Sequence, residues 1–443
     1  MKRLKKVVPI LLSAVMLLGA APQPNANANA NANANAANAA KEAEKEPRDQ
    51  KEKIHTSKGV EPMTASEKKA YDEAMARPES ALLRSYITGD YHTGTIYEEY
   101  NADAVVGLAS TSKLMSIYCI FDAINKGEIG MKDPVTIGHE AASMHGSTYK
   151  MKEGEVYTVE ELIHAGMIVS GNDAMIALAE YIAGSQEAFV ARMNQQAAEM
   201  GLTHAHFINC HGLTDYAKND YNRATAREMF ILARRLISDY PIVLNATSRM
   251  KLDEPNRHYL AYTTNPLLGI LKDVDGLKTG YTGIAGRCFI ATGLVKGGGR
   301  YLPTRFIGVY MGAQNDMDRY AAALKLSERA LGHRDRYLCK KDEEVGVLEL
   351  DDASPNKNPV YAAEDRMYVE APGEEIKRYV DFYDVAAPHA KEKPVGRVRF
   401  VSGGEEIGRT EVYLKEDIQK PNPILRYRDL MAEAFRAMEG FAS

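Results

Sequence analysis

The sequence predicts an α/β (α+β) domain, then a small all-β domain, then an amphipathic C-terminal helix. Strand-like and helix-like segments alternate across residues 63–340, as in a domain that packs helices on a sheet. Short alternating segments separated by turn residues occupy residues 341–418, and residues 419–443 carry apolar side chains at helical spacing. The chain has 443 residues, 45% of them hydrophobic, which is enough for a large core.

The first 40 residues have the features of a signal peptide followed by a low-complexity tract. Four basic side chains precede an apolar run from Val7 to Ala20, which is too short to span a bilayer comfortably. Small-residue cleavage sites recur in the Ala/Asn tract from Asn25 to Ala40. We therefore expect an exported protein, in the periplasm or at the extracytoplasmic face of the cytoplasmic membrane. An uncleaved N-terminal anchor is the alternative.

Residues 41–62 are rich in Lys and Glu and poor in apolar residues, which predicts a charged linker that does not fold. The formal net charge of the chain is -5. Because this charge creates no basic field, nucleic acid is not an expected partner.

Residues 63–340 are expected to contain strands on either side of two helical regions. The predicted elements are a hairpin of 82–87 and 95–97, a helix over 110–124, a helical region over 158–182 that breaks at 170–172, and paired strands at 289–292 and 304–310. In the predicted β domain, 397–401 and 407–414 form a hairpin, and 377–383 is a further strand.

The C-terminal segment places five apolar side chains on one helical face: Ile424, Tyr427, Met431, Phe435 and Met438. The pattern leaves two interpretations open. The helix lies at a membrane surface through residues 424–441, or it packs against its own domain.

Four cysteines, Cys119, Cys210, Cys288 and Cys339, do not have the spacing of a disulfide framework. Cys119 and Cys288 lie in apolar segments, where a small buried side chain is the simpler interpretation. No C-x-x-C or paired-histidine spacing accompanies them, so no metal is expected.

Ser110 and Lys113 are three residues apart, so a helix would place both side chains on one face. A neutral lysine there could accept the serine proton, but its ordinary pKa near 10.4 must first be lowered by burial or a second cation. The S-x-x-K spacing by itself is weak, because an exposed N-cap serine and lysine would produce it equally well.

Two later motifs strengthen the case. Ser170 and Asn172 lie two apart in a turn between helical stretches, where a hydroxyl can relay a proton and an amide can hold a substrate carbonyl. Lys278 and Thr279 then place a cation and a hydroxyl on a strand, and Gly280 leaves room for a substrate strand. Lys278 can be the second cation that would lower the pKa of Lys113.

S-x-x-K, a Ser/Asn element and K-T-G, in this order, are used by serine β-lactamases and penicillin-binding proteins. From about Leu82 to the β domain, the sequence resembles the low-molecular-mass members, the serine-type D-alanyl-D-alanine carboxypeptidases. The segments that carry the resemblance are Ala109–Met115, Gly146-Ser147 with Val159–Leu162, Ser170–Ala174, His211–Leu213 and Asp275–Thr282. The β domain and amphipathic tail match the family layout, which favours the membrane-surface interpretation of the tail.

The resemblance implies a penicillin-binding/serine β-lactamase-like transpeptidase fold and a two-step acyl transfer on a peptidoglycan stem peptide ending in D-Ala-D-Ala. Ser110 would be acylated and Lys113 would take its proton. Ser170 and Asn172 would assist, Lys278 and Thr279 would meet the substrate carboxylate, and the N–H groups of Ser110 and Tyr281 would form the oxyanion hole. No cofactor or metal is implied, and β-lactam antibiotics would acylate Ser110 as covalent inhibitors.

The sequence departs from the family pattern at Gly89–His92 and at Tyr262–Asn265, which lacks an arginine often found before the K-T-G strand; this puts carboxylate recognition in doubt. His92 and His211 are interpreted as structural turn residues, since a serine-lysine site needs no imidazole. The alternatives are a D,D-endopeptidase, a β-lactamase on the same fold, and a catalytically silent wall-binding scaffold. A class A β-lactamase needs a glutamate-bearing loop after the Ser/Asn element. The sequence has no E-x-x-L-N segment between Asn172 and Lys278, which speaks against this alternative.

Overall fold

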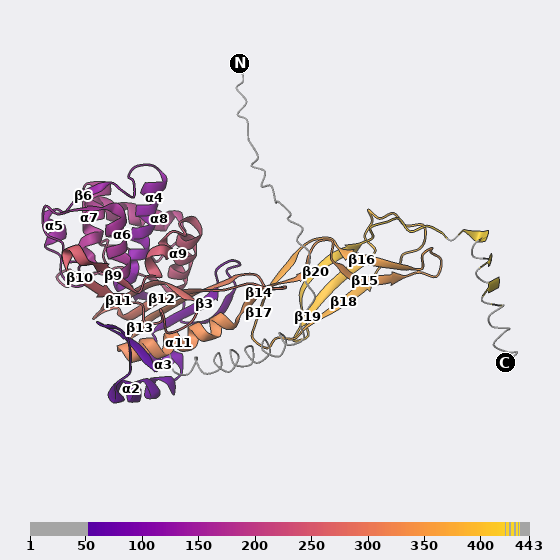
Figure 1. Ribbon diagram of the computed structural model, residues 1–443, viewed down its shortest axis with the longest axis horizontal. Coiled ribbons are helices and arrows are strands. Elements are labelled where there is room, and N and C mark those ends of the chain that lie inside the picture. The colour runs from indigo at the N-terminus through magenta and orange to yellow at the C-terminus, as the bar shows by residue number, and fades with distance from the viewer. Residues whose placement is uncertain (1–51, 421, 425–426, 429–430, 433, 435–443) are drawn as a thin grey trace, which may run out of the picture. The chain divides into compact units, whose positions relative to one another are not determined.

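A computed structural model describes residues 52–420, 422–424, 427–428, 431–432 and 434 (Figure 1). The expected signal peptide and Ala/Asn tract (1–40) and most of the expected C-terminal helix (424–441) lie outside the described residues. Within the described residues, no helix is long and apolar enough to cross a membrane.

The helices are α2 (Ala65–Met75), α3 (Glu79–Leu82), α4 (Lys113–Asn125), α5 (His139–Ala142), α6 (Val159–Ile168), α7 (Asn172–Ala183), α8 (Gln186–Glu199), α9 (Ala226–Asp239), α10 (Val243–Thr247) and α11 (Asp316–Gly332), with 3-10 turns η1 (Ala109–Ser112) and η2 (Pro255–Arg257). The strands up to α11 are β1 (Lys53–Thr56), β2 (Gly59–Pro62), β3 (Ser85–Asp90), β4 (Ile96–Tyr100), β5 (Val105–Gly107), β6 (Pro134–Thr136), β7 (Val156–Thr158), β8 (Arg223–Thr225), β9 (Lys251–Glu254), β10 (Tyr259–Tyr262), β11 (Val274–Thr282), β12 (Gly286–Val295) and β13 (Thr304–Ala313). The strands after α11 are β14 (Arg334–Cys339), β15 (Glu344–Glu349), β16 (Lys357–Ala362), β17 (Arg366–Glu370), β18 (Ile376–Phe382), β19 (Gly396–Ser402) and β20 (Glu405–Tyr413).

The part of the chain before β14 is built on a five-stranded antiparallel sheet in the order β11-β12-β13-β3-β4. Its β3–β4 and β12–β13 pairs confirm the two strand pairings predicted from the sequence. Strand β11, which carries Lys278-Thr279-Gly280, forms one edge of this sheet, and no other described strand pairs with its outer side.

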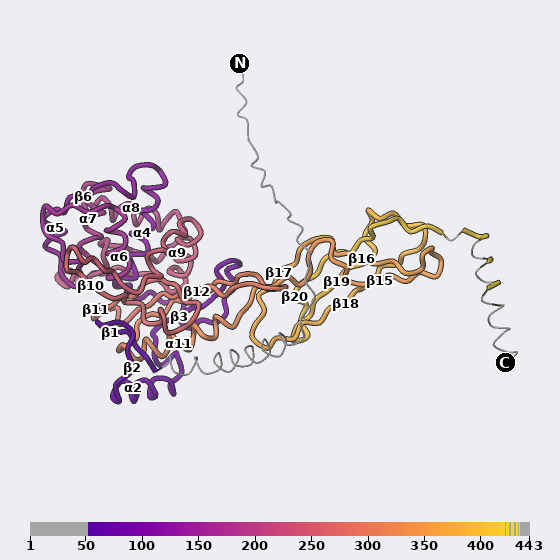
Figure 2. Tube along the Cα trace, in the orientation of Figure 1, coloured from indigo at the N-terminus to yellow at the C-terminus, as the bar shows by residue number. Residues whose placement is uncertain are grey.

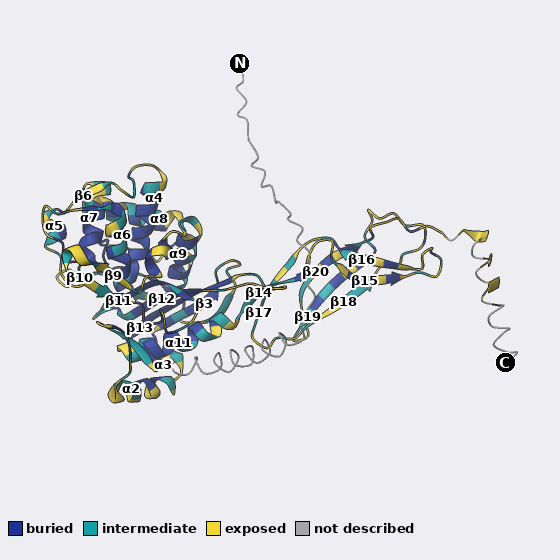
Figure 3. Cartoon of the chain, viewed as in Figure 1, coloured by how far each residue is buried: buried dark blue, intermediate teal, exposed yellow. Residues whose placement is uncertain are grey.

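Side chains that alternate along the sheet serve two separate cores. On β12 and β13, Ile290, Ile307 and Val309 belong to the larger core, which contains most of the buried side chains of α4, α6, α7 and α9. Their neighbours Phe289 and Tyr310 point to the opposite face, which α11 covers (Figure 1). Burial is densest in α4 and in the central strands (Figure 3). The sheet is therefore covered on both faces.

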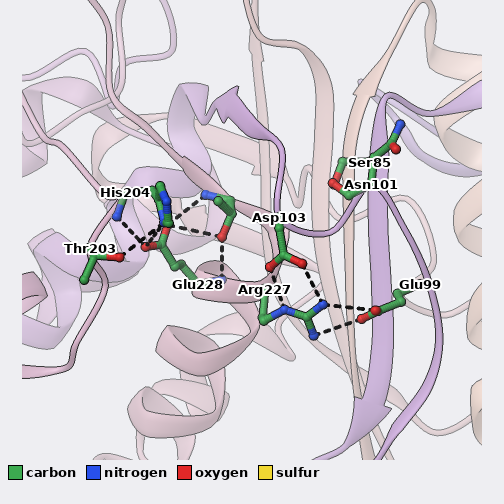
Figure 4. A network of polar contacts seen from close by, with 9 residues as sticks. Ser85, Glu99, Asn101, Asp103, Thr203, His204, Arg227 and Glu228 are labelled. Carbon is green, nitrogen blue, oxygen red and sulfur yellow. Dashed lines mark hydrogen bonds and ion pairs between the residues drawn. The ribbon is translucent and has the colours of Figure 1, made fainter.

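The N-terminus of α9 is held by a network of charged contacts (Figure 4). Arg227 donates to Asp103 over 2.7 and 3.0 Å and to Glu99 over 3.0 Å. Glu228 completes a capping box with Thr225 and accepts from the backbone N–H of His204 at 2.6 Å. These contacts tie α9 to strand β4 and to the loop before β8.

The segment 53–62 folds, and the interpretation of 41–62 as an unfolded linker needs correction for these ten residues. Strands β1 and β2 form a hairpin in which Lys53 pairs with Pro62. Ile54 and Val60 pack against the core beneath α11. Composition alone missed this hairpin because it counts only the apolar residues of the segment itself. Two apolar side chains are enough to hold a hairpin in place when they pack on a core that other segments form.

The C-terminal strands form a second sheet, β15-β16-β20-β19-β18, with its own core. The β19–β20 hairpin and β18 confirm the predicted strands of the all-β domain. Strand β14 lies before residue 341 and pairs with β17. All four cysteines are buried and free, so none of them forms a disulfide.

Candidate active site

Ser110 lies in η1, directly before the buried helix α4. The chain enters this turn through Ala109, whose φ of 47° is in the left-handed region. The turn directs Ser110 into a cavity of about 750 Å³, whereas the helix that follows is almost fully buried. The nucleophile candidate therefore stands in the turn that leads into a core helix, where packing fixes its position.

Lys113 is fully buried behind Ser110. Its Nζ lies 2.9 Å from Ser110 Oγ and donates to Asn172 Oδ1 and to the backbone oxygen of His211, both at 2.7 Å. Burial lowers the pKa of Lys113 to about 7, and the charges of Cys210 and Asp173 oppose this shift only in part. The amine is therefore close to equal protonation at neutral pH.

Ser170 is hydrogen-bonded to the second lysine, Lys278. It stands in the turn between α6 and α7 with φ of 62°, and its Oγ accepts a 2.9 Å hydrogen bond from Lys278 Nζ. Lys278 is buried, and burial, followed by the charge of Lys113, lowers its pKa well below the usual value. A second 2.9 Å bond to the backbone oxygen of Thr279 holds the amine in place.

Asn172 begins α7 and is fixed on both sides. Its Nδ2 donates to the backbone oxygen of His145 at 2.8 Å, and its N–H donates to the backbone oxygen of Ser147 at 2.8 Å. The next residue, Asp173, accepts two bonds of 2.9 and 3.0 Å from the N–H of Tyr149. The turn that carries Ser170 and Asn172 is thus tied to the loop 145–149.

Gly280 lets strand β11 lie against the turn of Ser110. A Cβ at this position would stand 2.8 Å from Ser110 N and 2.9 Å from Thr111 N, closer than side-chain atoms can approach backbone. Beside it, Thr279 donates to Thr264 Oγ1 at 2.6 Å. At the start of the strand, Arg305 forms two 2.7 Å bonds to Asp275.

Two arginines that the sequence interpretation missed line the same cavity. Arg319 donates to Asp316 at 2.9 Å, and Arg287 lies 3.1 Å from the other oxygen of that carboxylate. The Nε atoms of both arginines are buried with no hydrogen-bond partner among the described residues. Arg287 also stacks 3.9 Å above the ring of Tyr281. One carboxylate therefore serves two guanidinium groups at the cavity wall.

The structure brings the predicted residues together. Ser110, Ser170, Asn172, Thr279, Gly280 and Tyr281 line the cavity. Lys113 and Lys278 lie behind it and reach it through the two serine oxygens. The expectation that Lys278 also touches the substrate carboxylate stays a prediction, because its Nζ is directed to Ser170 and Thr279.

His211 contributes its backbone rather than its ring. Its carbonyl accepts from Lys113, while burial lowers the pKa of the imidazole to about 3 and keeps it neutral. The following Gly212 has φ of 95°, and a Cβ there would lie 2.1 Å from the oxygen of Ala109. Side-chain motifs do not reveal a backbone acceptor such as the His211 carbonyl. The glycine that follows it, Gly212, is the sequence signal that could have indicated a special backbone conformation here.

No group of three or more His, Cys, Asp or Glu side chains positioned to hold a metal ion occurs among the described residues. The polar groups around Ser110 are hydroxyls, an amide and the amines of two buried lysines, which suit acyl transfer through serine.

The chain is similar to several known proteins. The family model described as D-alanyl-D-alanine carboxypeptidase matches residues 72–315. The chain is 30% identical over 345 residues to D-alanyl-D-alanine carboxypeptidase DacF of Bacillus subtilis, covering 76% of this chain and 86% of that protein.

Two solved structures are similar. The D-alanyl-D-alanine carboxypeptidase DacD from Francisella tularensis has a TM-score of 0.60 at 26% identity, covering 76% of this chain and 94% of that one. Penicillin-binding protein D2 from Listeria monocytogenes, solved in an ampicillin-bound form, has a TM-score of 0.50 at 28% identity, covering 56% of this chain and 97% of that one. Because the family match spans more than half of its residues, this chain belongs to the D-alanyl-D-alanine carboxypeptidase family.

Proposed function

We propose that this protein removes the terminal D-alanine from peptidoglycan stem peptides through an acyl-enzyme on Ser110. The observation that carries the proposal is the environment of Lys113 Nζ. A neutral amine has two hydrogens and one lone pair. Asn172 Oδ1 and the His211 carbonyl take the two hydrogens at 2.7 Å each, which leaves the lone pair for the hydroxyl of Ser110 at 2.9 Å.

In the first step, Ser110 Oγ attacks the carbonyl carbon of the penultimate D-alanine as Lys113 takes the hydroxyl proton. The ester bond forms and the amide bond breaks, and the proton passes to the departing nitrogen of terminal D-alanine. In the second step, water attacks the ester, Lys113 takes a proton from it, and Ser110 regains its hydrogen. Each step returns the lysine to its neutral form.

The remaining cavity residues take supporting roles. Ser170 lines the same cavity as Ser110 and accepts a hydrogen bond from Lys278, so it relays a proton toward the leaving nitrogen. The N–H groups of Ser110 and Tyr281 hold the developing oxyanion, which the close approach of Gly280 to Ser110 N supports. Thr279 and Arg319 bind the terminal carboxylate, so that Arg319 replaces the arginine that the sequence lacks at Tyr262–Asn265.

β-lactam antibiotics present a strained amide with a nearby carboxylate, so they acylate Ser110 in the same orientation. The similarity to the ampicillin-bound Listeria protein supports this partner. A D,D-endopeptidase from Pseudomonas aeruginosa is also similar, at 27% identity over 213 residues, and it covers 46% of this chain. The longer match to a carboxypeptidase favours terminal D-alanine as the leaving group.

The deciding experiment measures D-alanine release from a pentapeptide ending in D-Ala-D-Ala, together with covalent labelling by a fluorescent penicillin. Wild-type protein should do both, and Ser110→Ala should do neither. Ser238→Ala, a change at an exposed serine on α9, serves as the matched control. Stable labelling without D-alanine release would contradict the carboxypeptidase, and rapid loss of the label with antibiotic hydrolysis would indicate a β-lactamase.

We also propose that the protein is exported and that residues 424–441 contact the membrane surface. The basic and apolar N-terminal run supports export, and the helical spacing of apolar residues supports the contact. Both segments lie largely outside the described residues. Co-sedimentation with anionic vesicles of the exported protein, with and without residues 419–443, tests the contact.

A further inference from the structure

The β1–β2 hairpin lines the catalytic cavity although it lies outside the family match, which begins at residue 72. Four consecutive residues, Ile54 to Ser57, stand in the wall of the cavity that contains Ser110. The hairpin, β11 and α2 are labelled in Figure 2. This chain therefore adds a wall to the cavity from a segment that the family model does not include.

The hairpin is fixed to the catalytic part by polar and apolar contacts. His55 Nε2 donates to the backbone oxygen of Leu268 at 2.6 Å, and burial lowers the pKa of this imidazole, which favours its neutral form. Tyr320 donates to the backbone oxygen of Lys53 at 3.0 Å. Gly59 packs on the ring of Tyr262, and a Cβ at position 59 would lie 3.0 Å from the Cε1 atom of that ring. The anchors are the loop after β10 and the helix α11.

These two anchors identify the end of the cavity that the hairpin closes. The loop after β10 includes Thr264, whose hydroxyl accepts from Thr279, and α11 carries Arg319 next to Tyr320. Thr279 and Arg319 are the residues assigned above to the terminal carboxylate. The hairpin thus stands on the leaving-group side of Ser110, next to the terminal residue of the substrate.

We infer that the β1–β2 hairpin is the wall of the leaving-group subsite and that it restricts the leaving group to a single small D-amino acid. This inference rests on the proposed carboxypeptidase function. In a cross-linked substrate the departing nitrogen belongs to the side chain of a second stem peptide. The bond formed on Ser110 and the bond broken are the same, but the second peptide must continue into space that Ile54 to Ser57 occupy.

The structure allows the hairpin to be removed cleanly. Met63 N–H donates to the backbone oxygen of Glu52 at 2.8 Å, so the chain on either side of residues 53–62 is already adjacent. A variant in which Gly-Gly replaces residues 53–62 keeps this connection and uncovers the core side chains against which Ile54 and Val60 pack. A second variant, His55→Ala with Tyr320→Phe, keeps the hairpin and removes two of its anchors. Lys58→Ala, at an exposed turn residue outside the cavity wall, is the matched control.

The measured quantity is the ratio of kcat/KM for cleavage of a cross-linked stem-peptide dimer to kcat/KM for D-alanine release from the pentapeptide. Fluorescent-penicillin labelling shows in each variant that the catalytic centre has folded. We expect the ratio to rise by about tenfold or more when the hairpin is removed, to rise when its anchors are lost, and to stay unchanged in Lys58→Ala.

The possible outcomes separate this inference from the function on which it rests. An unchanged ratio in a penicillin-labelled hairpin variant would overturn the role of the hairpin and leave the carboxypeptidase intact. If wild-type protein cleaves the cross-linked dimer as fast as it releases D-alanine from the pentapeptide, the role of the hairpin is also overturned and the carboxypeptidase function stands. If wild-type protein labels with penicillin but releases no D-alanine, the proposed function fails, and the inference fails with it. If the Gly-Gly variant is not labelled by penicillin, the ratio measured in the His55→Ala, Tyr320→Phe variant decides whether the hairpin restricts the leaving group.

Discussion

The Nζ atom of Lys113 lies 2.9 Å from Ser110 Oγ while the lysine is fully buried. Contact without burial would leave the amine charged at neutral pH and unable to accept a proton. Burial without the contact would leave the serine unactivated. In the proposed mechanism, this combination makes the protonation state of Lys113 the control on acylation.

The first prediction concerns pH. Because burial lowers the pKa of Lys113 to about 7, its charged form prevails below that pH and its neutral form above. The rate of Ser110 acylation should therefore rise with pH, with a midpoint near 7. Lys113→Arg, which stays protonated throughout, should lose acylation over the whole range. Stopped-flow labelling with a fluorescent penicillin measures the profile; a flat profile from pH 5.5 to about 9 would rule out this role for the lysine.

The second prediction concerns Gly280. In Gly280→Ala the new Cβ would stand 2.8 Å from Ser110 N, so β11 must move away from the oxyanion position. We expect acylation to fall by about 100-fold, the size of losing one oxyanion donor. Gly298→Ala is the control, because its Cβ meets nothing within 4 Å. Similar acylation rates in both variants would show that the close approach has no catalytic importance.

The third prediction concerns Arg305, which is buried and holds the start of β11 through Asp275. Arg305→Met leaves the carboxylate without its partner. We expect a loss of about 2 kcal/mol in the free energy of unfolding, less than for a fully buried pair because Asp275 is 28% exposed.

Urea denaturation followed by tyrosine fluorescence measures this loss. Lys251→Met, which breaks an ion pair whose two side chains are 49% and 42% exposed, should change stability by less than about 1 kcal/mol. Equal losses in the two variants would show that the Asp275 contact gives no special support to β11.

The fourth prediction concerns Arg319. If its guanidinium binds the terminal carboxylate, Arg319→Gln should raise KM for the pentapeptide by about tenfold or more. The same peptide with a C-terminal amide lacks the charge, so its kcat/KM should differ little between wild type and variant. The two substrates form the control for each other. A parallel loss on both substrates would indicate that Arg319 supports the cavity wall rather than the carboxylate.

Much of the fold followed from local patterns in the sequence. Apolar periodicity located α4, the break between α6 and α7, and several strands of both sheets, because each of these elements buries one face of a regular pattern. Strands β15 and β16 of the second sheet were not predicted. The hairpin β1–β2 escaped prediction because its stability comes from a core built by residues more than 200 positions away, such as Leu268 and Tyr320. Arg319 was missed for a similar reason, since nothing in its own segment marks it as lining the cavity that contains Ser110.

By itself, the sequence determined which chemical groups are available and in what order: a serine and lysine one helical turn apart, a Ser/Asn turn, and a Lys-Thr-Gly strand. Spacing and residue type suffice for this because motifs within one element have a geometry that the backbone fixes. Only the tertiary structure decided that Lys113 is buried beside Asn172 and the His211 carbonyl, that Lys278 reaches Ser170, and which side of the cavity is walled. Burial and long-range contacts set these properties, and both depend on how distant segments pack together.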